Sequence, residues 1–331
     1  MSELAGKHCL ITGGAGYVAA SLVNELLPVA ASIRRFGRSE SRPPLPEPAF
    51  ERARVEDMVG DVRVKADVER ALDGIDVVFH LASQTSVYVS DADPPADLEA
   101  NVLPMQHLLE LCRSQGKKRA ILFASTVTIT GLAEKLPVSE STPDVPVTTY
   151  DVHKRMAEQY LEFYVRRGLV TGGSLRLANV YGPGPKSSRP DRGVLNAMVR
   201  RALAGESLKL YRGYGDLIRD YVYVEDVARA FVKAAEHGSA LGGRSFVLSN
   251  GHGTTLRQAI GRVAAFVEEH TEKPVTVEEA EAPPGISPIE QRNFVGDISL
   301  LKKTTGFAPS IALDEGIRRM VAAFAEKTEN P

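Results

Sequence analysis

Tryptophan is absent from this chain of 331 residues, and cysteine occurs only twice, as Cys9 and Cys112. Both cysteines lie in apolar stretches, which is typical of buried thiols in a reduced protein and not of a disulfide framework or a metal site. The sequence also has no stretch of about 18 uncharged apolar residues, the length that a membrane-spanning helix needs. We therefore expect a cytoplasmic globular protein that does not enter a membrane.

An excess of charge of either sign is missing as well. Forty Lys and Arg residues stand against forty-two Asp and Glu residues, which gives a net charge of −2. This balance argues against bulk binding to nucleic acid or to acidic membranes. At this length about 75% of the surface of the unfolded chain can be buried, so one large domain or two modest ones need no disulfide or structural metal.

Short strand-like stretches alternate with helix-like stretches through the first half of the sequence. Strands are expected at residues 7–12, 32–36, 76–82, 119–125 and 173–177, and helices at residues 17–27, 97–115 and 150–167. This alternation predicts right-handed βαβ crossovers, and therefore a parallel sheet covered by helices on both faces. The expected fold class is α/β, with a Rossmann-type doubly wound parallel sheet in residues 1–181.

The sequence changes character after Tyr181. Gly and Pro alternate at residues 182–185, and the loop that follows carries Lys186, Arg189 and Arg192 against one acidic residue. Further helices are expected near residues 194–203, 225–236, 256–269 and 314–326, with short strands between them. We expect residues 182–331 to form a smaller mixed α/β lobe that binds substrate, packs on the C-terminal edge of the sheet and is partly interleaved with the first lobe.

A glycine-rich turn connects the first expected strand to the first expected helix, with the sequence GGAGYVA at residues 13–19. Glycines permit a tight turn and let a pyrophosphate approach backbone N–H groups at the positive end of a helix dipole. In this context the turn predicts dinucleotide binding, with Gly13, Gly16, Tyr17 and Val18 at the cofactor. The alternative is a tight turn that binds nothing.

The end of the second expected strand carries no carboxylate, although an acidic residue there would bind the ribose 2′-OH of NAD. The sequence instead places Arg35, Arg38 and Ser39 at this point. These residues suit a 2′-phosphate, because a guanidinium group pairs with phosphate through two hydrogen bonds. We favour NADP(H) over NAD(H) as the cofactor. The alternative is that the arginines lie on an exposed loop and bind no cofactor.

Tyr150 and Lys154 are four residues apart on an expected helix, so their side chains share one face. A cation beside a phenol lowers the phenol's pKa toward working pH, which makes the pair a proton acceptor or donor for a hydroxyl or carbonyl. Thr126, at the end of the preceding strand, would add a hydroxyl at the same sheet edge. The alternatives are a turn cap for Thr126, a solvated charge for Lys154 and a partly exposed histidine for His153.

These motifs, taken in order, resemble the extended short-chain dehydrogenase/reductases of the NAD-dependent epimerase/dehydratase family, which contains UDP-glucose 4-epimerase. The resemblance runs from about residue 7 to about residue 317. Further markers are GDV at residues 60–62, HLAS at 80–83, Asn101, LRLANVYGP at 175–183 and RDYVYVEDV at 219–227. Their order and spacing together are far more specific than any one of them.

The resemblance implies a role for each matching residue. Asp61 and Val62 would meet the adenine, and the cofactor would also be lined by Leu81, Ala82 and Ser83. Tyr150 would be the acid/base, Lys154 would hold the nicotinamide ribose, and Thr126 would take the family's Ser/Thr position. The residues predicted at the substrate are Gln84, Thr126, Asn179, Arg219 and Arg292. Of these, Asn179 and Arg219 would meet the diphosphate of a nucleotide sugar. Arg292 is a further cationic candidate, like Lys186, Arg189 and Arg192, and the alternative for each of these four is an ordinary surface charge.

The leading functional prediction is a nucleotide-sugar epimerase that works by transient hydride transfer to a bound nicotinamide cofactor, with Tyr150 as acid/base. The alternative is an NADPH-dependent 4-ketoreductase of a nucleotide-linked keto-sugar, which would use the same residues. A dehydrogenase of a non-sugar alcohol is less expected, because an apolar substrate has no need of Arg219 or of the basic loop. A non-catalytic dinucleotide sensor is less expected still, since it would not need Tyr150 and Lys154.

Two further expectations come from the resemblance. Members of the family that remove water from the sugar usually carry an Asp-Glu pair just after the Ser/Thr, and this chain has Val127 and Thr128 there. Elimination needs a general acid and a base, so 4,6-dehydration is not expected. The helices at residues 97–115 and 150–167 would pair with those of a second subunit, which predicts a homodimer.

Overall fold

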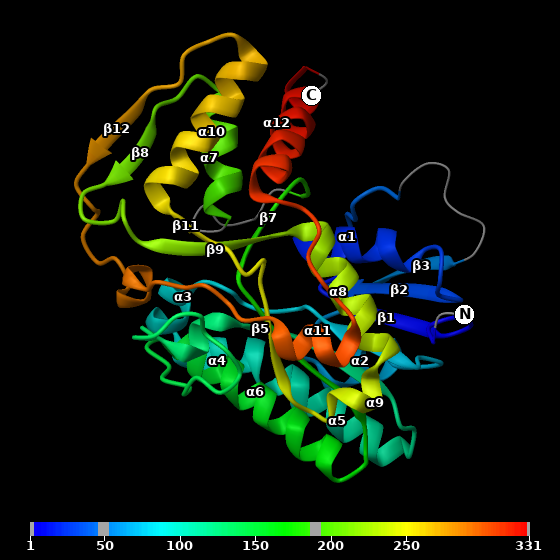
Figure 1. Cartoon of the computed structure of the whole chain (residues 1–331). Helices are drawn as coiled ribbons and strands as arrows, with labels where there is room; N and C mark the ends of the chain where they lie inside the picture. The colour runs from blue at the N-terminus through cyan, green and yellow to red at the C-terminus, as the bar shows by residue number, and fades with distance from the viewer. Residues whose placement is uncertain (1–2, 46–52, 186–192, 330–331) are drawn as a thin grey trace.

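A seven-stranded parallel sheet forms the centre of the computed structural model, which describes residues 3–45, 53–185 and 193–329 (Figure 1). The strands in spatial order are β10 (Ser245–Leu248), β6 (Thr171–Leu177), β5 (Ala120–Thr126), β4 (Val77–His80), β1 (His8–Thr12), β2 (Ser32–Gly37) and β3 (Arg54–Val59). Every neighbouring pair is parallel. The predicted Rossmann-type sheet is therefore confirmed.

Helices cover both faces of this sheet, and β1 shows why its sequence is almost entirely apolar. Cys9 and Ile11 point into a core formed with α1 (Tyr17–Leu26) and α8 (Val224–Glu236). Leu10 points the other way, into a core formed with α2 (Lys65–Ala71), α5 (Leu103–Gln115) and α6 (Thr149–Arg166). Because successive side chains of a strand alternate between faces, a sheet buried on both faces needs apolar residues throughout.

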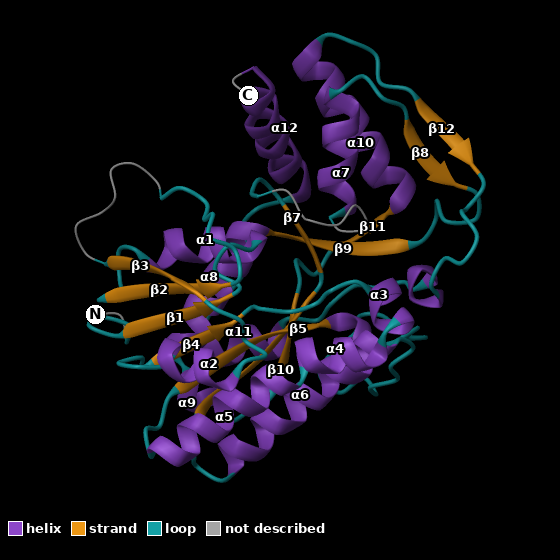
Figure 2. Cartoon of the chain, turned by 180° about the vertical axis from the view of Figure 1, so that it is seen from behind, coloured by secondary structure: helices purple, strands orange, loops and turns teal. Residues whose placement is uncertain are grey.

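A second body lies beyond the carboxyl ends of the strands, at the top of Figures 1 and 2. Its helices, α7 (Val194–Leu203), α10 (Leu256–Thr271) and α12 (Leu313–Glu329), pack around one apolar core. Its strands are β7 (Asn179–Tyr181), β8 (Leu208–Tyr211), β9 (Ile218–Tyr223), β11 (Gly253–Thr255) and β12 (Val277–Ala280). They form a three-stranded sheet, β11-β9-β7, and a two-stranded sheet, β12-β8.

Segments after residue 182 also return to the large sheet. Strand β10 pairs with β6, and α8 packs on α1. The division into residues 1–181 and 182–331 stays a prediction. The remaining elements are α3 (Val87–Ala92), α4 (Pro94–Asn101), α9 (Gly238–Leu241), α11 (Ser299–Thr305), η1 (Val127–Thr130) and η2 (Pro288–Gln291). Within the described ranges, every helix is too short or too polar to cross a lipid bilayer.

The single helix predicted at residues 97–115 is wrong, because the structure has two helices there. Helix α4 ends at Asn101 and α5 begins at Leu103, with Val102 between them at φ −108° and ψ −51°. Pro104 stands at the second position of α5. A proline has no N–H to donate to the preceding turn and fits only at a helix start, so one helix ends and the next begins.

Candidate active site

The glycine-rich turn leads directly from β1 into α1, and two of its glycines have no room for a side chain. Gly13 has φ +70°, and a Cβ there would lie 3.0 Å from backbone atoms of Ala82. A Cβ on Gly14 would lie 2.7 Å from Cβ of Arg35. Among the described residues no side chain caps α1, whose N-cap is Gly16. The first N–H groups of α1 thus remain for an anion, which fits a dinucleotide pyrophosphate.

Tyr17 joins this turn to the second half of the chain. Its hydroxyl donates a 2.8 Å hydrogen bond to the carbonyl of Gly182 and accepts one of 3.3 Å from Asn196. A Cβ on Gly184 would lie 2.6 Å from the Tyr17 ring. Burial raises the pKa of Tyr17, so the phenol keeps its proton. Asn196 is a residue that the sequence did not single out. Val18, next to Tyr17, packs against the core of α1 and α8.

The three residues predicted to bind a 2′-phosphate have different surroundings at the end of β2. Arg35 is buried and holds the carboxylate of Asp57 through Nε and Nη2, both at 2.7 Å, while Nη1 donates to the carbonyl of Pro43. Arg38 and Ser39 are exposed, and the Ser39 hydroxyl donates to the carbonyl of Ser41. Of the two arginines, Arg38 is therefore exposed to solvent, whereas Arg35 is held within the sheet.

The residues predicted at the adenine and along the cofactor follow β3 and β4. Asp61 pairs with Arg63 at 2.6 Å, and this hydrogen bond keeps the pKa of Asp61 below its usual range. Val62 lies beside it and packs against the core under α2 and α5. Leu81, Ala82 and Ser83 follow β4, where Ala82 faces Gly13 across the turn.

Hydrogen bonds to buried side chains fix the loop after β4. The N–H of Ala82 donates to Thr12 Oγ1 at 3.1 Å, and Thr12 Oγ1 lies 2.8 Å from Nδ1 of His80. Burial, with the nearby charge of Lys154, lowers the pKa of His80 to about 3, so its ring is neutral. The Ser83 hydroxyl donates to Asn101 Oδ1 at 2.6 Å. The carboxyl ends of β1 and β4 thus lie side by side at the predicted cofactor site.

Lys154 is buried at the carboxyl end of β5. Its ammonium donates a 2.6 Å hydrogen bond to the carbonyl of Ala124 and lies 4.1 Å from the centre of the Phe123 ring. In the part of the chain that the structure describes, it forms no ion pair with a carboxylate. Burial lowers its pKa to about 7, against the opposite influence of Glu158 and Asp97. A buried amine in these surroundings is a strong candidate for a functional group.

Tyr150 lies one helical turn before Lys154, near the start of α6. The Lys154 ammonium is 6.0 Å from the centre of the Tyr150 ring. The backbone N–H of Tyr150 donates to the hydroxyl of Ser90 at 3.1 Å, and its ring packs in a small apolar cluster with Val87 and Ile289. The tyrosine is thus held from α3 on one side and from η2 on the other.

Thr126 ends β5, as predicted, and it also caps the turn that follows. Its Oγ1 accepts a 3.2 Å hydrogen bond from the N–H of Thr128 and lies 2.7 Å from the hydroxyl of Thr128. The cap that we gave as the alternative for Thr126 is therefore present, and it does not exclude the catalytic role. Only 8% of the Thr126 surface is exposed, and its hydroxyl is held in place by the two contacts with Thr128.

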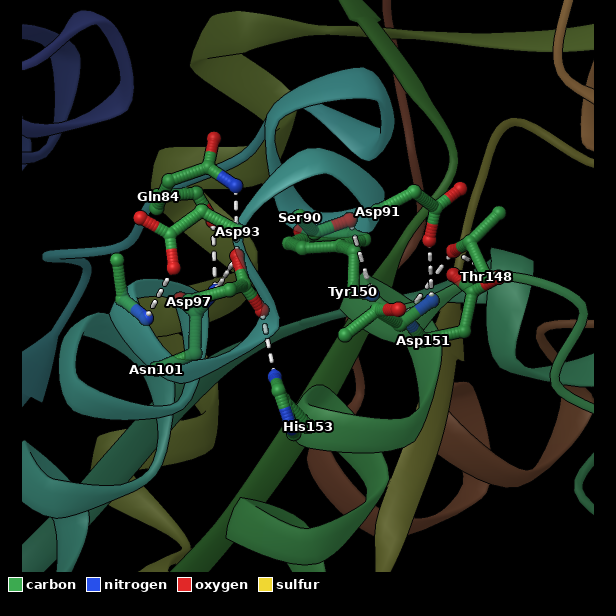
Figure 3. Close-up of polar contacts among 12 residues, drawn as sticks. Gln84, Ser90, Asp91, Asp93, Asp97, Asn101, Thr148, Tyr150, Asp151 and His153 are labelled. Carbon is green, nitrogen blue, oxygen red and sulfur yellow. Dashed lines mark hydrogen bonds and ion pairs between the residues drawn. The ribbon is translucent and has the colours of Figure 1, made fainter.

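Gln84 and His153 meet at one buried carboxylate, that of Asp97 on α4 (Figure 3). Gln84 Nε2 donates to Asp97 Oδ1 at 2.6 Å, and Asn101 Nδ2 donates to the same oxygen at 3.0 Å. His153 Nδ1 lies 2.7 Å from Asp97 Oδ2. The expectation of a partly exposed His153 is wrong, because α4 packs on α6 and only 7% of the residue is exposed.

The side chain of Gln84 is engaged inside the protein at both ends. Besides Asp97, its Nε2 donates to the carbonyl of Ser86, and its Oε1 accepts from the N–H of Ser86. Its predicted contact with substrate stays a prediction. Asp97 itself was missed, because one carboxylate at the start of a helix gives no signal of a buried partner.

Asn179, Arg219 and Arg292 come together although they are far apart in sequence. Arg292 Nη2 donates to Asn179 Oδ1 at 3.2 Å, and Arg219 Nη1 donates to the carbonyl of Arg292. Arg219 Nη2 also donates to the carbonyl of Glu290 at 2.7 Å, while the Glu290 carboxylate is 3.9 Å away. Burial, with the neighbouring charge of Arg292, lowers the pKa of Arg219 to about 10. Two buried guanidinium groups side by side favour an anion.

The predicted basic loop, with Lys186, Arg189 and Arg192, lies outside the described residues. The arrangement that is described combines a glycine cradle at the start of α1, a buried amine beside a tyrosine, and two arginines with an asparagine. These donors fit a nicotinamide dinucleotide along β1 and β4 and an anionic substrate beside η2.

Comparisons with known proteins agree with this arrangement. A UDP-glucose 4-epimerase of Mycolicibacterium smegmatis is 31% identical over 327 residues, which cover 97% of this chain and 99% of that protein. The structure of a UDP-glucose 4-epimerase of Thermotoga maritima with UDP-glucose matches with a TM-score of 0.83 and 29% identity, covering 97% and 99% of the two chains. That of a Thermus thermophilus UDP-glucose 4-epimerase in complex with NAD matches with a TM-score of 0.79 and 31% identity, covering 96% and 98%.

The family model for the NAD dependent epimerase/dehydratase family matches residues 9–249, a range that contains the glycine-rich turn, Thr126, Tyr150, Lys154, Asn179 and Arg219. The resemblance found in the sequence is thereby confirmed. This chain belongs to the NAD-dependent epimerase/dehydratase family.

Proposed function

We propose that this protein is a nucleotide-sugar 4-epimerase that acts on UDP-hexoses, with Tyr150 as the acid/base. The observation that carries the proposal is the buried amine of Lys154, which lies beside Tyr150 and is held by a backbone carbonyl instead of a carboxylate. The buried arginines beside Asn179 support an anionic substrate. The named relatives, two of which cover nearly the whole chain at 31% identity, support UDP-hexose and carbon 4.

The proposed mechanism assigns a task to each of three side chains. A bound nicotinamide dinucleotide supplies a group that accepts a hydride from the sugar and later returns it. Tyr150 takes the proton of the reacting hydroxyl and gives it back to the oxygen when the sugar is reduced again. Lys154 stabilises the deprotonated phenol by its charge and holds the ribose next to the nicotinamide. Thr126 hydrogen-bonds the sugar at the same edge of the sheet.

The substrate's diphosphate would meet Asn179, Arg219 and Arg292. Arg219 and Arg292 are both buried, and the one carboxylate near each in the ion pairs of the described residues is that of Glu290, at 3.9 Å from Arg219 and 3.7 Å from Arg292. A diphosphate would add further negative charge beside these two cations and accept hydrogen bonds from their N–H groups. Binding at this point would place the sugar on the Tyr150 side of η2, because Ile289 of η2 packs against Tyr150.

For the cofactor we infer a preference for NADP(H) over NAD(H), carried by Arg38. Arg38 is exposed just after β2, and residues 32–39 contain no carboxylate for a ribose 2′-OH. Arg35 does not take part, because Asp57 and Pro43 engage its guanidinium. We expect Arg38→Ala to weaken NADP⁺ binding about tenfold and NAD⁺ binding less than twofold. Equal losses for the two dinucleotides, measured by calorimetry, would contradict the inference.

The Arg38 observation also favours a second function, an NADPH-dependent 4-ketoreductase of a nucleotide-linked keto-sugar. The same three side chains would serve, with Tyr150 donating its proton to the carbonyl oxygen. The two functions differ in what happens to the dinucleotide. An epimerase regenerates it in each cycle, whereas a reductase consumes one NADPH for each product.

The purified protein distinguishes these functions in two steps. One sample is denatured, and any released nucleotide is identified. A second, native sample is incubated with UDP-glucose or UDP-galactose, and the products are separated by chromatography. The proposal predicts interconversion of the two sugars without net consumption of NADPH. In Tyr150→Phe we expect kcat to fall about 10²- to 10⁴-fold, with an unchanged circular dichroism spectrum. A wild type that does not interconvert UDP-glucose and UDP-galactose, but oxidises NADPH in the presence of a nucleotide-linked 4-keto sugar, would establish the reductase.

We also propose that two copies associate through α5 and α6. The support is Phe163 of α6, which is 45% exposed although it is large and apolar, together with Val152 on the same helix at 44%. Light scattering would show a mass of twice 35.8 kDa if the proposal is right, and a mass of 35.8 kDa if it is wrong. The cytoplasmic location stays a prediction.

A further inference from the structure

A line of hydroxyl groups connects Thr126 to the buried carboxylate of Asp151. The Oγ1 atoms of Thr126 and Thr128 are 2.7 Å apart, and Thr128 donates in turn to Asp151 Oδ1. Asp151 is fully buried and directly follows Tyr150 on α6 (Figure 3). Its second oxygen accepts a 2.7 Å hydrogen bond from Thr148, the N-cap of that helix. The proposed mechanism has given Thr128 and Asp151 no task.

The charge of Asp151 decides the direction of these hydrogen bonds. An ionised carboxylate only accepts, and each threonine hydroxyl has a single proton. The Thr128 hydroxyl therefore donates its hydrogen bond to Asp151, and the Thr126 hydroxyl must donate to Thr128 Oγ1. Burial raises the pKa of Asp151, and the hydrogen bonds from Thr128 and Thr148 and the charge of Arg292 oppose this rise. We take the carboxylate as ionised because each of its oxygens accepts a hydrogen bond from a hydroxyl group, one from Thr128 and one from Thr148.

The oxygen of Thr126 then has one position left for a ligand. It accepts from the N–H of Thr128 and donates its proton to Oγ1 of the same residue. A hydroxyl oxygen has two lone pairs, and one of them remains. A lone pair accepts a hydrogen bond from a hydroxyl and offers nothing to a carbonyl, so in this state Thr126 recognises an alcohol.

We propose that Asp151 is a positioning residue which, through Thr128, holds Thr126 as a hydrogen-bond acceptor for a hydroxyl of the sugar. The consequence for substrates rests on the proposed function, whereas the hydrogen-bond direction does not. Tyr150 remains the group that exchanges a proton with the reacting oxygen. In Asp151→Asn the amide can donate to Thr128, which reverses the line and makes Thr126 a donor.

Neutron diffraction from a deuterium-exchanged crystal of the full chain reads this direction without any substrate. We expect the deuteron of Thr126 to lie between Thr126 and Thr128, the deuteron of Thr128 to lie toward Asp151, and Asp151 to carry none. A deuteron on Asp151, or a Thr126 deuteron directed away from Thr128, would overturn the proposal whatever the protein's substrate is.

Kinetics with UDP-hexoses test the consequence for the reaction. We expect kcat/KM to fall about three- to tenfold in Thr128→Val and in Asp151→Asn, the effect of one hydrogen bond. Thr128→Ser keeps the hydroxyl and should stay within about twofold of the wild type. The double variant Thr128→Val/Asp151→Asn should lose no more than either single variant, because both changes act on one line of hydrogen bonds.

Thr130 provides the matched control. It lies on the same turn, is buried, and donates its hydroxyl to the carbonyl of Val127 at 2.9 Å, outside the line. An equal loss of kcat/KM in Thr130→Val, or losses that multiply in the double variant, would overturn the proposal. A wild type inactive on UDP-hexoses would refute the proposed function instead, and the neutron result would still decide this inference.

Discussion

Two buried cations, one on α6 and one on the strand β6 beside it, have opposite surroundings. Arg176, on β6, forms two hydrogen bonds with Glu158 and two with Asp144, at 2.6 to 3.0 Å. Lys154, one helical turn before Glu158, donates to the carbonyl of Ala124 and lies over the Phe123 ring. Both oxygens of Glu158 are engaged by Arg176, so this carboxylate does not bond Lys154.

The pKa values of the two cations differ for this reason. Burial alone would lower the pKa of Arg176, but Glu158 and Asp144 outweigh burial and raise it. At Lys154 burial prevails and the pKa falls to about 7. A buried cation with carboxylate partners is a fixed part of the fold, whereas one without them costs stability and is retained for a function. The comparison teaches that the partner of a buried charge, and not its burial, distinguishes the two roles.

The largest expected effect is on stability, at Arg176. Arg176→Met leaves the buried carboxylate of Glu158 without its main partner, so we expect the free energy of unfolding to fall by about 3–5 kcal/mol in urea titration. Arg155 is the control, because it contacts the same Asp144 and Glu158 but its side chain is 29% exposed. Arg155→Met should cost less than about 1 kcal/mol. Equal losses in the two variants would contradict the comparison.

The next effect is on activity, at Lys154. Lys154→Met removes the charge that stabilises the deprotonated Tyr150, so we expect kcat for UDP-hexose epimerisation to fall roughly a hundredfold. Near pH 7 the variant should be no less stable than the wild type, since a methionine fills the space without a buried charge. Lys117, which pairs with Asp76 on the surface, is the control. A K154M variant that is less stable than the wild type but fully active would show that Lys154 has a structural role and not a functional one.

A smaller effect is the pH dependence of stability that Lys154 contributes. Its pKa is about 7 in the folded protein and near 10.5 in the unfolded chain, so between these values the unfolded state binds more protons. Raising the pH from about 7 to about 10 should therefore stabilise the wild type relative to K154M, by at most about 1.4 kcal/mol per pH unit. Paired unfolding titrations at pH 7, 8 and 9 measure the difference, and a constant difference would contradict a lowered pKa.

Much of the fold could be predicted from the sequence, because local patterns determine it. Strand β1 has three apolar residues at its centre, the turn after it is rich in glycine, and the helices at residues 194–203 and 225–236 lie within one residue of the prediction. Tyr150 and Lys154 share a face of α6 for the same local reason, the helical period. Chemistry that depends on spacing along one element is readable from the sequence.

The side-chain contacts that could not be predicted join residues that are far apart along the chain. Arg35 is engaged by Asp57 because β2 and β3 pair with these two residues opposite each other, a register that no local pattern contains. Asp97 holds His153 across 56 residues, and Asp151 reaches Thr128 across 23. Each of these contacts is a polar pair with at least one buried member, formed by the packing of separate elements.

The central claim, that Tyr150 and Lys154 serve a 4-epimerase, is tested most directly with UDP-glucose carrying deuterium at carbon 4. If the hydrogen leaves as a hydride and returns to the same carbon from the bound dinucleotide, UDP-galactose formed in ordinary water should keep the deuterium, and Tyr150→Phe should form almost none of this product. Nuclear magnetic resonance measures both the deuterium retained in the product and the amount of product formed. Loss of the label to solvent, or product formation that persists in Tyr150→Phe, would contradict the account.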